Sequence, residues 1–140
     1  AIFSYIVHII RDFQEDQLNN LNYFASEILE RNNLNPQDLK EIAKGAPIRD
    51  AFRNVIREYY NKARVYGEQT LSELENLASG LNSRYLLSLH IIYHLYKQVF
   101  DRIDIEKGSF TSAELKPGSG EIKEKVLEIT SAWPVSKKNI

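Results

Sequence analysis

Three carboxylates lie within five residues near the start of the chain. Glu15 and Asp16 follow Asp12 by three and four residues. A helix would therefore place all three on one face, with the Cβ atoms of the four-apart pair about 5–6 Å from each other. Like charges this close repel, and the helix dipole disfavours anions at a helix C-terminus. Because no basic residue lies between Arg11 and Arg31, the pattern predicts a bound cation.

The ligand types indicate which cation this would be. Carboxylate oxygens without histidine or cysteine suit Mg²⁺, which keeps several waters and uses substrate phosphate to complete its octahedron. An acidic helix end that contacts only water is the alternative, and the spacing alone does not decide between the two.

Composition limits the classes of function. The 140 residues are 43% hydrophobic and 26% charged, as expected of one domain with a core. The net charge is -1, from 18 basic and 19 acidic residues, so no nucleic-acid partner is expected. The absence of cysteine excludes disulfides, thiolate metal sites and a cysteine nucleophile, and is compatible with a cytoplasmic location.

Hydrophobic spacing predicts an all-α fold in which residues 1–140 form a single domain or half-domain. The expected core helices are residues 2–16, 36–44, 47–79 and 84–104, followed by a short helix at 121–129. Apolar residues surround almost the whole first helix, which is typical of a central position. Asn35 and Pro36 favour a helix start, Gly45 favours a helix end, and Gly67 is a point where the long helix could bend.

The chain opens inside an apolar segment with no capping residue before it, and this segment is too short for a membrane span. We therefore expect that further chain precedes Ala1. Apolar surface would then contact the missing part or a second copy of the chain, which makes a homodimer an expected state of the isolated chain.

The acidic cluster lies in a run that resembles a known family. Residues 8–16, HIIRDFQED, followed by Tyr23 and the segment 26–29, look like the second aspartate-rich region of the squalene/phytoene synthases. Residues 57–63 are similar to the family's tyrosine and alanine helix, and residues 84–86 and 95–104 resemble its last core helix. The resemblance covers residues 1–104 in the right order.

This resemblance implies the C-terminal half of an isoprenoid-synthase-type helical bundle. Members join two prenyl diphosphates head to head between two aspartate-rich helices and Mg²⁺. The implied function is a Mg²⁺-dependent prenyltransferase whose substrate is farnesyl or geranylgeranyl diphosphate. NADPH would be needed only if the product is squalene, and peripheral membrane contact would suit such a substrate.

The resemblance also implies site residues. Asp12 and Asp16 would be Mg²⁺ ligands, with Glu15 a weaker one and no catalytic residue beyond the metal site. Tyr5, His8 and Arg11 would contact substrate. A metal-neutralised diphosphate leaves more readily, and aromatic walls can shelter the allylic cation that results. Such a wall could include Phe3, Tyr5 and Phe13, although buried aromatics are more often plain core.

The sequence also departs from the family. Tyr5 and His8 stand where members usually have glutamine and asparagine, residues 17–25 lack the usual basic residues, and no first aspartate-rich motif is present. We therefore expect the chain alone to be inactive. A catalytically inactive, family-like interaction or assembly module is the main alternative, and a partner-binding helical domain unrelated to the family is a third.

His90 and His94 are four residues apart, a spacing that can hold a metal ion. No glutamate follows His90 in the manner of a metalloprotease helix. We expect the two rings to be packed between helices instead.

Overall fold

The computed structural model describes residues 1–134, and these form eight helices and no strand. The helices are α1 (Ile2–Arg11), α2 (Phe13–Leu18), α3 (Ser26–Arg31), α4 (Pro36–Ala43), α5 (Asp50–Leu77), α6 (Ser83–Phe100), α7 (Ser112–Leu115) and α8 (Ser119–Ala132). The predicted all-α class is confirmed. The predicted unit of residues 1–140 also includes 135–140, which lie outside the described residues.

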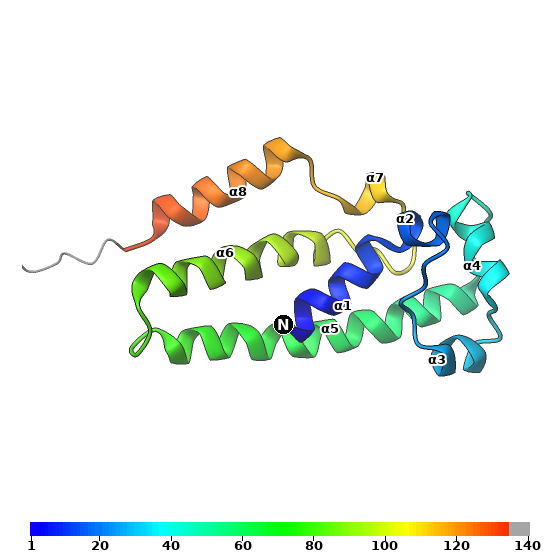
Figure 1. Ribbon diagram of the computed structural model, residues 1–140, viewed down its shortest axis with the longest axis horizontal. Helices are drawn as coiled ribbons and strands as arrows, with labels where there is room; N and C mark the ends of the chain where they lie inside the picture. The colour runs from blue at the N-terminus through cyan, green and yellow to red at the C-terminus, as the bar shows by residue number, and fades with distance from the viewer. Residues whose placement is uncertain (135–140) are drawn as a thin grey trace, which may run out of the picture.

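The two longest helices form the base of the fold. Figure 1 shows α5 and α6 side by side in opposite directions, with α1 in front of them and α8 along the outer side of α6. α1 packs against both α5 and α6, but within residues 1–134 its outer face stays open, with Ile2 51% and Tyr5 59% exposed. The predicted central position, enclosed on all sides, is therefore wrong. The inward face of α1 is buried through residues one or two turns apart: Phe3, Ile6, Val7 and Ile10.

Aromatic side chains fill the core where α1 meets α2. Phe13 lies 4.7 Å from Phe52 and 5.8 Å from Phe24, measured between ring centroids. Phe110, from the segment before α7, packs on Phe52 at 5.8 Å. Phe13, Phe52 and Phe110 are at most 2% exposed. Segments far apart in the sequence thus share one core, which fixes the position of the turn between α1 and α2.

The predicted ends of α4 are confirmed. The Asn35 side chain accepts a hydrogen bond from the Asp38 backbone N–H, and the Asp38 carboxylate accepts one from the Asn35 backbone N–H. This reciprocal capping box satisfies two backbone donors that a helix start leaves free. At the other end Gly45 has φ = +106°, a conformation that favours glycine and stops the helix.

Gly67 does not bend the long helix. α5 runs through it as a single 28-residue helix, about 42 Å long at 1.5 Å per residue. A Cβ atom at this position would lie 3.0 Å from the Phe3 ring. Gly67 therefore allows the close approach of α1 to α5.

Several predicted helix boundaries are wrong. The helix expected at 2–16 is interrupted at Asp12 and continues to Leu18. The helix expected at 47–79 begins only at Asp50, because Arg49 before it is extended. The helix expected at 84–104 ends at Phe100, where the chain turns, and the one expected at 121–129 extends over 119–132, because Gly118 and Glu121 form its start. No helix was predicted at α7.

Candidate functional site

Asp12 lies in the turn between α1 and α2, surrounded by cationic side chains. Arg11 donates two hydrogen bonds to its carboxylate, at 2.8 Å from Nε to Oδ1 and 2.9 Å from Nη2 to Oδ2. His8 Nε2 lies 2.9 Å from Oδ2, and Lys116 Nζ lies 3.5 Å from Oδ1. The side chains of adjacent residues in a regular helix do not face each other. The pairing of Arg11 with Asp12 is therefore consistent with the interruption of the helix at Asp12.

His8 has a defined role in this arrangement. Its Nδ1 lies 2.8 Å from Arg11 Nη2, and since a guanidinium can only donate, Nδ1 must accept. A neutral His8 therefore carries its proton on Nε2 and donates it to Asp12.

These contacts set the charge state of Asp12. Burial alone would raise the pKa of its carboxyl group, but the hydrogen bonds and charge of Arg11, helped by His8 and Lys116, outweigh this effect. The pKa is therefore lowered from its ordinary value, and Asp12 remains a carboxylate at neutral pH.

The prediction that the acidic cluster has no compensating charge is wrong. Lys116, about 100 residues further along the chain, pairs with Glu15 and approaches Asp12. The dipole argument is also wrong for part of the cluster. Because α1 is interrupted at Asp12, Glu15 and Asp16 lie in the first turn of α2, where a helix dipole favours anions.

Asp16 differs from its two acidic neighbours. Within residues 1–134, no basic side chain lies within ion-pair distance of its carboxylate. Burial raises the pKa of Asp16, and the negative charge of Asp12 raises it further. Asp16 thus holds a negative charge that the surrounding protein leaves partly uncompensated.

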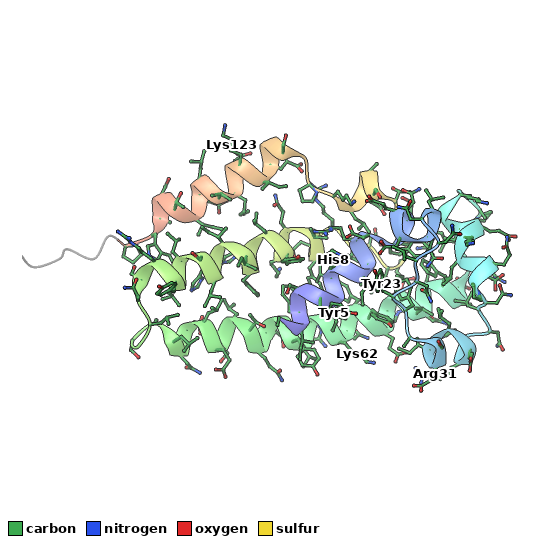
Figure 2. The ribbon with its side chains drawn as sticks, viewed as in Figure 1. Tyr5, His8, Tyr23, Arg31, Lys62 and Lys123 are labelled. Atoms are coloured by element: carbon green, nitrogen blue, oxygen red, sulfur yellow. The ribbon has the colours of Figure 1, made fainter. Side chains whose placement is uncertain are left out.

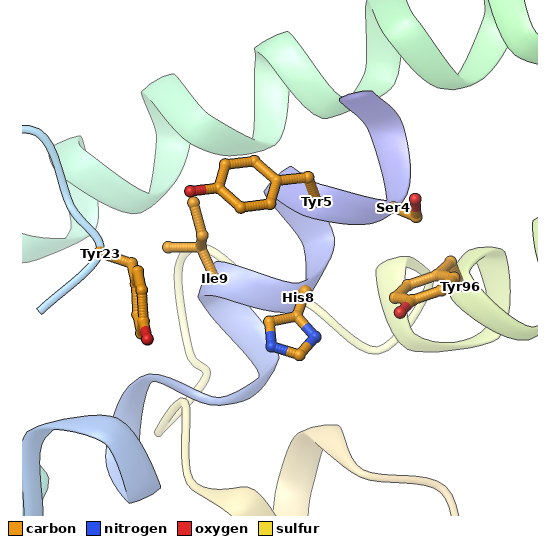
Figure 3. Close-up of a pocket in the computed structure, with 6 residues that line it drawn as sticks. All are labelled: Ser4, Tyr5, His8, Ile9, Tyr23 and Tyr96. Carbon is orange, nitrogen blue, oxygen red and sulfur yellow. The ribbon is translucent and has the colours of Figure 1, made fainter. Parts of the chain in front are cut away.

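An open pocket of about 410 Å³ lies beside this cluster, between α1, α6 and the segment after α2. Its lining is mainly aromatic: Ser4, Tyr5, His8, Ile9, Tyr23 and Tyr96 (Figure 3). Figure 2 places Tyr5, His8 and Tyr23 close together on the outward side of α1. His8 connects pocket and cluster, since its ring lines the pocket and bonds to Asp12.

The residues predicted to contact substrate do not all line the same pocket. Tyr5 and His8 line the pocket. Arg11 instead lines a neighbouring cavity of about 230 Å³, and its guanidinium lies 5.8 Å from the centre of the Tyr96 ring. Phe3 and Phe13, considered as wall residues, are both 2% exposed and belong to the core. These two aromatics are therefore plain core residues and not part of a substrate wall.

Sequence reasoning missed Tyr96 and Lys116 as site residues. Tyr96 is one of many apolar residues on a strongly hydrophobic helix, so no local pattern distinguishes it. Lys116 stands alone in a turn-rich segment, and only the fold brings it to Glu15.

The residues present suit one kind of metal binding. In the described part of the chain, no three histidine, cysteine, aspartate or glutamate side chains are arranged to hold an ion. Mg²⁺ does not need such a cage, because it commonly uses one or two carboxylates together with water and substrate phosphate. Asp16, which has no basic partner within residues 1–134, is the carboxylate that could hold such an ion, whereas Asp12 is already occupied by Arg11, His8 and Lys116.

Comparisons with known proteins give no relative. No family model matches the chain, and neither a curated protein nor a solved structure matches it. None of the helices between residues 1 and 134 has the length and apolar character of a membrane span. The resemblance to squalene/phytoene synthases therefore stays a prediction that depends on the motif residues.

Proposed function

We propose that this chain provides the second aspartate-rich half of a Mg²⁺-dependent prenyltransferase of the squalene/phytoene synthase type. In this proposal Asp12 and Asp16 hold the metal that binds a prenyl diphosphate. One observation carries it: α1 positions a carboxylate cluster and an aromatic pocket next to each other, joined by His8. A ligand with an anionic head and an apolar chain needs this combination.

Different residues of the chain would bind the diphosphate and the hydrocarbon chain of the substrate. Mg²⁺, when bound, would neutralise diphosphate charge and so improve it as a leaving group. Arg11 and Lys116 already lie beside Asp12 and would donate hydrogen bonds to phosphate oxygens. Tyr5 and Tyr96 in the pocket wall would contact the hydrocarbon chain, and aromatic faces stabilise a nearby carbocation.

Lys116 would compete with a metal ion for the carboxylates of Asp12 and Glu15. Its ammonium group pairs with Glu15 and lies 3.5 Å from Asp12 Oδ1. A divalent ion that reaches Asp12 must displace this contact together with those of Arg11 and His8. The released ammonium group would then be free to bind phosphate.

Calorimetry with a nonreactive farnesyl diphosphate analogue tests the proposal. The analogue should bind in the presence of Mg²⁺ and at least tenfold more weakly without it. Asp16→Asn should abolish the Mg²⁺ dependence, whereas Glu30→Gln, at an exposed acid on α3, should preserve it. Binding that ignores Mg²⁺, or that Asp16→Asn leaves intact, would contradict the assignment.

One observation favours the second candidate, an inactive interaction or assembly module. Tyr85, Leu89 and Ile92 lie on one face of α6 and are 67%, 40% and 51% exposed. An apolar stripe of this kind is typical of a surface that contacts another protein. This reading predicts self-association that Ile92→Asp abolishes, with no Mg²⁺-dependent binding of the analogue.

A further inference from the structure

Helix α8 contacts the rest of the fold mainly through α6. It lies along α6 (Figure 1), yet none of its residues is buried. Lys123 points away from α6 into solvent (Figure 2). A helix that buries so little apolar surface gains little free energy from packing, so a small change at its contacts can decide whether it stays attached.

The attachment has one anchor at each end. Near the start of α8, Glu121 pairs with Arg102, which follows α6. Just after its end, Trp133 Nε1 donates a hydrogen bond to Ser83 Oγ at 3.0 Å. The Trp133 ring packs on His90, with 5.1 Å between ring centroids.

Between these anchors, α6 presents two histidines toward α8. The His90 and His94 rings are stacked with centroids 6.1 Å apart, so they are packed between helices as expected. His94 also lines a cavity of about 460 Å³ under α8, together with Leu71, Tyr93, Lys97, Gln98, Asp101 and Lys125.

The charged side chains around His94 form two ion pairs, one on each side of it. On its own helix, His90 and Lys97 are positive or can become so, and Tyr93 packs edge-on at 5.0 Å. From α8 it faces Lys125 and Glu128, and at the end of α6 Asp101 is paired with Lys97. The cavity residue that α5 contributes, Leu71, is uncharged. Burial lowers the pKa of His94, and the charges of His90 and Lys125 lower it further.

We propose that α8 is a pH-sensitive strap that stays on α6 while His94 is neutral and loosens when His94 takes up a proton. The observation behind it is a helix without buried residues that covers a half-buried histidine and brings Lys125 next to it. This inference does not depend on the proposed prenyltransferase function.

The direction of the effect follows from the protons bound in each state. When α8 is detached, His94 loses burial and the charge of Lys125, two of the causes that lower its pKa, so the pKa rises toward its ordinary value. When α8 is docked, the pKa is lower, so the detached state binds more protons in the pH range between the two pKa values. Docking therefore weakens as the pH falls through this range, and stops weakening below the pKa of the docked state. Each unit between the two pKa values changes the docking equilibrium tenfold.

Amide hydrogen exchange at pH 7.5 and pH 5.5, corrected for intrinsic exchange rates, tests the strap. Protection of α8 should fall at the lower pH, while protection of α1 and α5 should not. His94→Gln should make the protection of α8 the same at both pH values. Glu121→Gln is the matched control: it should weaken protection at both values and keep the ratio between them.

Two results would overturn the proposal. One is protection of α8 in the native protein that does not change with pH, and the other is an unchanged ratio in His94→Gln. If His94→Gln detaches α8 at both pH values, Lys125→Met decides the question. Removing this positive charge raises the pKa of docked His94 and must reduce the pH dependence. An undiminished dependence in Lys125→Met rejects the proposal.

Discussion

Replacing Asp16 by asparagine should stabilise the metal-free protein. No basic side chain in the described residues pairs with Asp16, and both burial and the charge of Asp12 raise its pKa. A carboxyl group whose pKa is raised on folding contributes stability that is present below its ordinary pKa and is lost as the pH rises through the folded value. At neutral pH the ionised Asp16 therefore lowers stability.

The size of the gain comes from the spacing of the two carboxylates. A like-charge pair four residues apart costs about 0.2–0.5 kcal/mol, so Asp16→Asn should raise the free energy of unfolding at pH 7 by at most that amount, because loss of the favourable interaction with the α2 dipole offsets part of the gain. In a chain of this length this corresponds to an increase of at most about 1–2 °C in Tm. The gain should vanish below the ordinary pKa of 3.8, where Asp16 is protonated in both states.

Urea denaturation at pH 7 and at pH 3 measures the effect, with Glu30→Gln as the control. Glu30 is exposed on α3, and its neutralisation should change stability little at either pH. The same Asp16→Asn protein should lose Mg²⁺-dependent binding of the diphosphate analogue. A variant that is less stable than the native protein at pH 7 would refute the electrostatic reasoning.

Three further substitutions test other parts of the account. Lys116→Met removes a partly exposed ion pair, so it should lower the free energy of unfolding by at most about 1 kcal/mol. It should also tighten Mn²⁺ binding by up to about fivefold. Weaker Mn²⁺ binding in a titration would show that Lys116 does not compete with the metal. Phe52→Ala empties a fully buried position and should cost about 3–5 kcal/mol in urea denaturation, and a loss under 1 kcal/mol would contradict the aromatic core. Asn35→Ala removes the α4 cap and should cost about 1 kcal/mol, whereas an unchanged free energy of unfolding would mean that the cap is dispensable.

The sequence predicted the features that depend on local patterns. Apolar residues at helical spacing indicated the long helices because a helix must bury one face. The ends of α4 were predictable because capping at Asn35 and the left-handed conformation at Gly45 involve only neighbouring residues. The enclosed position predicted for the first helix was wrong, because the apolar side chains of Ile2 and Tyr5 lie on its exposed outer face.

The missed features depend on contacts between distant segments. The charge balance of the acidic cluster requires Lys116, and nothing near Lys116 in the sequence points to Glu15. The interruption at Asp12 was also not predicted. Side chains that pair along a regular helix are three or four residues apart, so the sequence did not indicate that Arg11 would pair with the adjacent Asp12. The pocket depends on Tyr96, which only the packing of α6 against α1 brings to His8.

The central claim is that Asp12 and Asp16 hold a divalent ion next to a diphosphate. Crystals grown with Mn²⁺ and the nonreactive farnesyl diphosphate analogue test it most directly, because Mn²⁺ scatters anomalously and accepts the same oxygen ligands as Mg²⁺. We expect an anomalous peak at coordination distance from a carboxylate oxygen of Asp16 and from a phosphate oxygen, with Lys116 displaced from Asp12. An analogue bound without such a peak, or a peak remote from both aspartates, would contradict it.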